Sequence, residues 1–165
     1  MESTIHNRTT DRAGFFTFFW SVLLTTALSA LVMWLCGGYA GYAFTRPGYL
    51  MPAAAVYVLD IAARLVFGLS LFFTLYASER EGANETAKTA CVTLWTIAYA
   101  MSILLIPALF ALKWQMFSFI WMLAMIGVTT TQFIVSFKVS IAAALSVLPY
   151  WALLIYGACV LFAIM

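Results

Sequence analysis

The chain has 165 residues, of which 65% are hydrophobic and only 8% are charged, and its formal net charge is +2 at pH 7. Soluble globular domains carry about 25% charged residues, so this composition excludes a soluble monomer and indicates an integral membrane protein. The small net charge, without a block of basic residues, argues against a nucleic-acid partner.

The hydrophobic residues form five long stretches joined by shorter links. About 20 apolar residues cross the hydrocarbon core of a bilayer, and each stretch reaches roughly that length. Backbone groups in lipid must be satisfied within the segment, and the stretches lack the alternation of a barrel strand, so we expect helices. The whole chain, 1–165, is predicted to be one all-α membrane domain, a five-transmembrane-helix bundle with spans at 14–36, 50–77, 89–112, 116–137 and 141–164.

The longest link, residues 37–49, follows the first span and is rich in glycine and aromatic residues. Gly37 and Gly41 have a spacing that can bring helices close, although glycine also serves to turn the chain. Aromatic residues with a polar tip suit a membrane interface. Because this link is too apolar to be fully exposed to water, we expect it to fold back over the bundle and cap it.

The second span contains Asp60 and Arg64, and no other charge interrupts the stretch from Met51 to Ser78. Ionisable groups at membrane depth are costly and usually face a bundle interior or a cavity. Residues four apart are neighbours on a helix, so one interpretation is an intrahelical ion pair. The other is that the pair lines a cavity and meets a polar part of a ligand, where an arginine suits a carboxylate. A proton relay is a third interpretation, weakened by the absence of other buried acids.

The last three spans carry hydroxyl and amide residues and two prolines. Hydroxyl groups in membrane helices usually bond to a carbonyl or to a neighbouring helix, and we assign most of them to that role. Pro107 and Pro149 are expected to kink the third and fifth spans and to open space between helices. Very short links at Lys113 and Lys138 predict that successive helices are antiparallel neighbours. The polar residues are Ser102, Thr129, Thr130, Thr131, Gln132, Ser136 and Ser146.

The basic residues predict the orientation of the bundle, because cytoplasmic links carry an excess of lysine and arginine. Five of them fall on the N-terminal side and two on the opposite side. The sequence therefore predicts a multi-pass protein of the plasma (inner) membrane with its N-terminus in the cytoplasm. The five are Arg8, Arg12, Arg80, Lys88 and Lys138, and the two are Arg46 and Lys113.

Catalytic and metal chemistry have few candidates in this chain. The single histidine, His6, lies in the polar N-terminal tail, and the three cysteines are far apart without metal-ligand spacing. No nucleophile–base pair or phosphate-binding loop is present. We therefore predict no catalytic residue, no metal site and no cofactor, and the sequence does not argue for an enzyme.

Two segments of the chain follow a recognisable pattern. Residues 46–52, Arg-Pro-Gly-Tyr-Leu-Met-Pro, look like a basic-Pro-x-aromatic segment before a second span, and Leu148-Pro149-Tyr150 with Tyr156-Gly157-Ala158 looks like the start of a fifth span. Pro107, Phe110 and Lys113 fit the end of a third span. On these residues the chain resembles the translocator protein / tryptophan-rich sensory protein family (TspO/MBR), over roughly residues 44–161.

The resemblance implies a membrane receptor or binding protein with a cavity between the five helices, under the 37–49 link. Its ligand would be a hydrophobic or amphipathic small molecule, tetrapyrrole-like or sterol-like. A bound porphyrin or lipid would then be a ligand and not a cofactor, and the resemblance also implies a homodimer in contact with membrane lipid. The implied ligand-binding residues are Phe44, Arg46, Tyr49, Pro52, Tyr57, Asp60, Arg64, Ser102, Leu105, Tyr150, Leu153 and Tyr156.

The chain departs from the family where aromatic pocket walls are typical. The typical Trp and Tyr of the second span fall at Asp60 and Arg64, and the typical Trp of the fifth span falls at Leu153. Two alternative functions stay open: a small transporter or proton-coupled carrier that uses the two charges, and a structural subunit of a larger membrane complex. Tetrapyrrole breakdown, which is claimed for the family, is a minor alternative.

Overall fold

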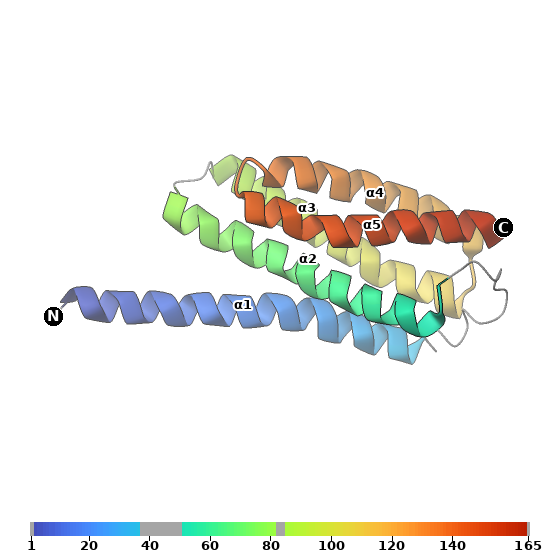
Figure 1. Ribbon diagram of the computed structural model, residues 1–165, viewed down its shortest axis with the longest axis horizontal. Coiled ribbons are helices and arrows are strands. Elements are labelled where there is room, and N and C mark those ends of the chain that lie inside the picture. Colours follow the sequence, from blue (N-terminus) through green and yellow to red (C-terminus); the bar gives the residue numbers. More distant parts are fainter. Residues whose placement is uncertain (1, 37–50, 82–84, 165) are drawn as a thin grey trace.

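The computed structural model describes residues 2–36, 51–81 and 85–164, and these residues form a bundle of helices without a strand (Figure 1). Five helices within these ranges are long and apolar enough to cross a membrane. This confirms the predicted all-α five-helix bundle and the assignment to multi-pass membrane proteins. The elements are α1 (Glu2–Leu35), α2 (Ala53–Glu81), α3 (Glu85–Ile106), the π-helical turn η2 (Pro107–Ala111), α4 (Gln115–Ser136) and α5 (Ile141–Ile164).

Helix α1 is longer than its membrane-crossing part. The apolar segment Phe16–Leu35 lies inside the predicted span 14–36, but the helix begins at Glu2. No proline interrupts residues 2–35, and proline is the residue that most strongly breaks a helix. As a result, α1 runs past the ends of the other helices on its N-terminal side (Figure 1).

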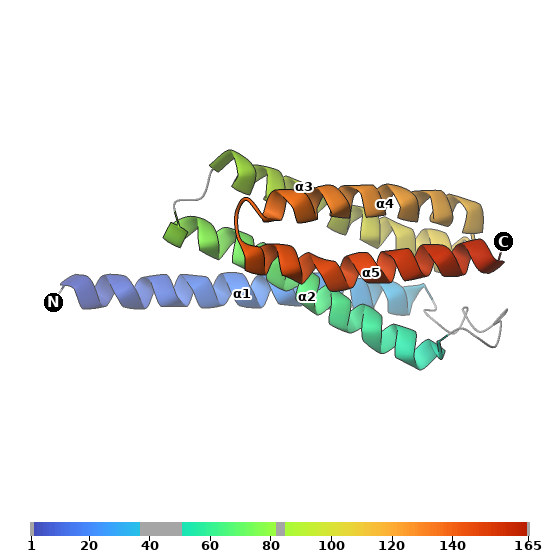
Figure 2. The same cartoon turned by 45° about the horizontal axis from the view of Figure 1, so that its top comes forward.

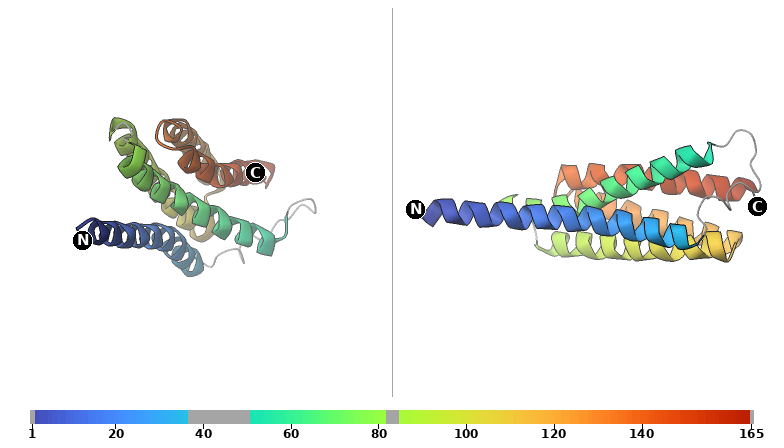
Figure 3. Two further views of the ribbon diagram at one scale, coloured as in Figure 1. Left: turned by 60° about the vertical axis from the view of Figure 1, so that its left-hand side comes forward. Right: turned by 90° about the horizontal axis from the view of Figure 1, so that it is seen from below.

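The helices form a ring, and α2 has extensive contacts with two neighbours in it, α1 and α5. Helix α2 packs extensively along α1 and α5, α5 packs along α4, and α4 packs along α3. Helix α3 meets α2 and α1 over shorter stretches. The two short links thus join neighbouring helices, as the sequence predicts. Helix α1 lies on the outside of the bundle beside α2 (Figures 2 and 3).

The contact between α1 and α2 depends on Gly68. A Cβ atom at Gly68 would clash with Thr25 Oγ1 and would lie 3.0 Å from the carbonyl oxygen of Ser21 and 3.1 Å from Val22 Cα. Ser21, Thr25 and Ser29 recur every fourth residue on the buried face of α1. Small residues at this spacing let two helix backbones approach closely in a membrane. The contact is therefore made by backbone and short side chains.

The same substitution at two glycines tests this contact. Gly68→Ala is expected to destabilise the protein by about 1–3 kcal/mol, the usual effect of overpacking. Gly127→Ala is the matched control, because a Cβ there meets nothing within 4 Å. Alanine should stabilise that helix position by up to about 1 kcal/mol. Thermal unfolding in detergent measures both, and equal stability of the two variants would contradict the assignment.

Candidate functional site

Asp60 and Arg64 form an ion pair one turn apart on α2. Arg64 Nε donates to Asp60 Oδ2 at 2.9 Å, and the two residues are only 6% and 8% exposed. A single charge buried at membrane depth would be strongly unfavourable, and the close contact compensates each charge with the other. The two side chains therefore form the ion pair within one helix that their spacing in the sequence predicts.

Arg64 also joins α2 to three other helices. Its Nη1 group donates to Ser29 Oγ on α1 at 3.1 Å and to Ser102 Oγ on α3 at 2.6 Å. Its guanidinium carbon lies 5.9 Å from the ring centroid of Tyr150 on α5, within the range of a cation–π contact. The sequence analysis included Ser102 and Tyr150 but missed Ser29. The four-residue spacing of Ser21, Thr25 and Ser29 is the signal that could have found it.

A stack of aromatic rings supports this arrangement. The Phe67 ring lies 4.6 Å from Tyr150 and 5.6 Å from Trp95, and Trp95 lies 5.2 Å from Tyr99. The polar ends are satisfied, since Trp95 Nε1 donates to the Phe67 carbonyl and the Tyr99 hydroxyl donates to the carbonyl of Leu24. Rings at these separations attract each other beyond simple burial, so the Tyr150 ring is held in place.

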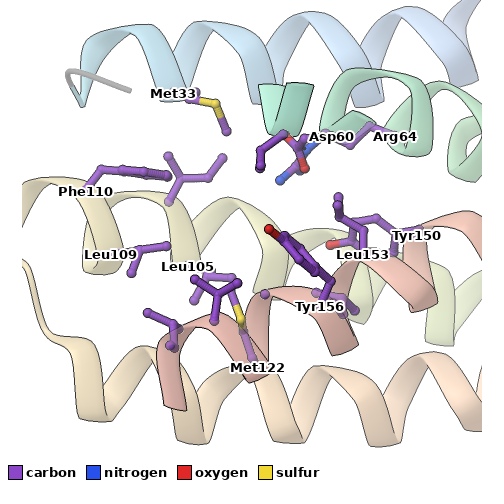
Figure 4. Close-up of a pocket in the computed structure, with 16 residues that line it drawn as sticks. Met33, Asp60, Arg64, Leu105, Leu109, Phe110, Met122, Tyr150, Leu153 and Tyr156 are labelled. Carbon is purple, nitrogen blue, oxygen red and sulfur yellow. Dashed lines mark hydrogen bonds and ion pairs between the residues drawn. The ribbon is translucent and has the colours of Figure 1, made fainter. Parts of the chain in front are cut away.

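A cavity of about 90 Å³ lies beside the charged pair. It occupies the half of the bundle where α1 ends and α2 begins, and we call it the central cavity (Figure 4). Most of its wall is apolar, including Met33 of α1 and Met122 of α4. The charged pair therefore lines a cavity, and its contact with a ligand stays a prediction. Six predicted site residues line it: Asp60, Arg64, Leu105, Tyr150, Leu153 and Tyr156.

Other predicted site residues lie elsewhere. Ser102 is buried next to Arg64 and holds it, but it does not line the central cavity. Pro52 and Tyr57 are exposed and also do not line it, so their contact with a ligand stays a prediction. The first turns of α2 lie at the edge of the bundle (Figure 2), and Tyr57 is 40% exposed there although its neighbour Val56 is buried. Phe44, Arg46, Tyr49 and the predicted cap at 37–49 lie outside the described residues.

The π-helical turn η2 supplies part of the cavity wall that the sequence did not reveal. Proline has no N–H group and clashes with the carbonyl four residues earlier in a helix. In the turn that begins at Pro107, the helix widens, and the Leu112 N–H donates to the Pro107 carbonyl five residues back, at 2.9 Å. Leu109 and Phe110 within this turn line the cavity. The expected kink at Pro107 is thus a widened turn. Helix α5 continues through Pro149 to its end at Ile164.

Tyr156 marks the edge of the central cavity. It lines the cavity from α5, and its hydroxyl accepts a hydrogen bond from the Met51 N–H at 3.3 Å, just before α2 begins. The labelled side chains in Figure 4 show Tyr156 lying across the space between Asp60 and Met122. The same turn of α5 contains Gly157, where an added Cβ would lie 3.2 Å from the Met122 side chain. Glycine at this position therefore leaves room for the Met122 side chain at the cavity wall.

Three buried polar atoms in the described part of the chain make no hydrogen bond: Ser118 Oγ, Gln132 Oε1 and the Tyr150 hydroxyl. Of these three residues, only Tyr150 lines the central cavity. Buried polar groups are nearly always paired, so an exception at a cavity wall indicates a place for a partner. No three His, Cys, Asp or Glu side chains of residues 2–36, 51–81 and 85–164 come together as a metal site would require.

Comparison with known proteins does not extend these observations. No protein-family model matches the chain, and no curated protein matches it.

The balance of charge at the site is testable by a double substitution. Arg64→Met should destabilise the protein by about 3–5 kcal/mol, because Asp60 is then a buried charge without its partner. Adding Asp60→Leu should recover a large part of that loss, since neither charge remains to be desolvated. Thermal unfolding in detergent measures the two variants. A double variant that is less stable than Arg64→Met alone would show that the pair is not the source of the loss.

Proposed function

We propose that this chain is a membrane binding protein for a hydrophobic or amphipathic small molecule, held between the helices in the central cavity. The observation that carries the proposal is a charged pair built into the wall of an otherwise apolar cavity. Small-molecule sites combine a mostly apolar lining with a few placed polar groups. Ionisable residues inside membrane spans are rare and usually mark a ligand or ion site.

A distant relationship to the TspO/MBR family, which we also propose, is supported by where its characteristic residues lie. Phe110, Tyr150, Tyr156 and Gly157 belong to the segments on which the resemblance rests, and all four line the central cavity. A tetrapyrrole-like or sterol-like ligand follows from that relationship. The proposed orientation, with the N-terminus in the cytoplasm, is supported by the excess of basic residues on that side.

The size of the cavity requires side chains to move when such a ligand enters. A cavity of about 90 Å³ has room for several water molecules, at about 10–15 Å³ each. Sites for larger ligands are usually clefts of about 300–1,000 Å³. Met33 and Met122 project into the cavity from opposite sides (Figure 4), and methionine side chains adapt readily because they are unbranched. We expect these two side chains to make room.

Two neighbouring leucines test the location of the binding site. Leu105 is 6% exposed and lines the cavity, whereas Leu104 is 58% exposed on the outer surface. Leu105→Trp places an indole in the cavity and should weaken binding at least about tenfold, because overpacked volume is not easily accommodated. Leu104→Trp should bind like the unchanged protein. Equilibrium dialysis of the purified protein in detergent against a sterol and a porphyrin measures this.

Thermal unfolding of both tryptophan variants separates lost binding from lost folding. The proposal fails if the unchanged protein binds no ligand saturably. The site assignment fails if Leu105→Trp is folded and binds as tightly as Leu104→Trp.

A further inference from the structure

The charged pair contributes no net charge to the wall of the central cavity. Among the residues that the structure describes, Asp60 and Arg64 are the only charged ones that line it, and they neutralise each other at 2.9 Å. A guanidinium group has five N–H donors, and Arg64 commits three of them to Asp60, Ser29 and Ser102. A ligand carboxylate would be a second anion beside Asp60, where the low dielectric makes the repulsion between like charges strong. The Arg64 charge, which the ligand carboxylate would need as its countercharge, is already compensated by Asp60.

The Tyr150 hydroxyl supplies the polar contact that the charged pair does not. Tyr150 is 2% exposed, and its hydroxyl faces the cavity (Figure 4) without a hydrogen bond to a described residue. Arg64 and Ser102 are among the polar groups around it, and Ser102 Oγ accepts a hydrogen bond from Arg64 Nη1 at 2.6 Å. The ring cannot easily turn away, because Phe67 packs against it at 4.6 Å. A hydroxyl group fixed in this way can donate to, or accept from, an uncharged oxygen.

We infer that the central cavity selects ligands whose polar group is an uncharged oxygen, an alcohol or a carbonyl, over ligands with a free carboxylate. The inference rests on the proposed function and names the chemical class of its ligand. It reverses the expectation from the sequence that Arg64 would meet a ligand carboxylate. The ligand oxygen bonds to Tyr150, and the apolar body of the ligand lies against the methionine and leucine side chains of the wall.

Three fluorescent probes with one ring and different heads test this selection. Pyrene with a hydroxymethyl, a carboxylate or an aminomethyl group presents the same planar body with a neutral, negative or positive head at pH 7. Each is titrated into the purified full chain in detergent, with empty micelles as the blank, and fluorescence anisotropy reports binding. The neutral probe should bind at least about tenfold more tightly than the carboxylate, because juxtaposed like charges strongly disfavour a complex.

Two substitutions assign the selection to named atoms. Tyr150→Phe should weaken binding of the neutral probe about threefold to tenfold, the effect of one neutral hydrogen bond. Tyr76→Phe makes the same chemical change at a residue that is 40% exposed and outside the cavity, and it should leave binding unchanged. Asp60→Asn removes the anion from the wall and leaves the Arg64 charge uncompensated, so the preference should turn toward the carboxylate probe.

The outcomes separate this inference from the proposed function. If none of the probes binds saturably, the proposed function fails at this cavity and the inference fails with it. If the carboxylate binds as tightly as the alcohol, and Leu105→Trp abolishes both, the binding function stands and selection for a neutral head is overturned. Unchanged affinity of the neutral probe in a folded Tyr150→Phe variant also overturns it.

Discussion

The structure depends on how one arginine is accommodated at membrane depth. Arg64 keeps its charge and is only 8% exposed, so its donors must be satisfied largely by other parts of the protein. Asp60 supplies the countercharge from the same helix, and Ser29 and Ser102 bring α1 and α3 to the same group. The Tyr150 ring brings α5. One side chain therefore constrains the relative positions of four helices, and any rearrangement of the bundle has to keep these contacts or replace them.

The central cavity follows from three local features that act together. The charged pair occupies volume on one side of α2, while the widened turn after Pro107 directs Leu109 and Phe110 inward. Gly157 leaves room for the Met122 side chain of α4 at the same level. The remaining wall is apolar, so a ligand in this space is held mainly by burial of apolar surface, and its orientation is set by very few polar groups.

The architecture could be predicted from the sequence because span length and apolar composition are local properties. The pairing of Asp60 with Arg64 could be predicted for the same reason, since a spacing of four residues is enough to make them neighbours on a helix. The residues that contact the pair from other helices depend on how the helices cross. The residues next to Ser29 in the sequence do not reveal its contact with Arg64, and those next to Tyr57 do not reveal that Tyr57 is exposed. The widened turn at Pro107 was expected only as a kink, because proline removes a hydrogen bond without determining how the chain closes the gap. The central cavity combines five helices, so its lining residues could be proposed in advance only from the two charges in α2 and from alignment with a family pattern.

The location of both charges on one helix also affects how the protein is assembled. An ion pair between residues four apart forms as soon as the helix does, before any other helix is in place. The membrane-crossing part of α2, Ala54–Tyr76, therefore carries no net charge when it enters the bilayer, and no partner helix is needed to supply a countercharge. Had the acid been on α1, α3 or α5, an uncompensated arginine would have had to cross or remain in lipid during synthesis. Because the countercharge lies within α2, this helix can insert whichever of the other helices packs against it first.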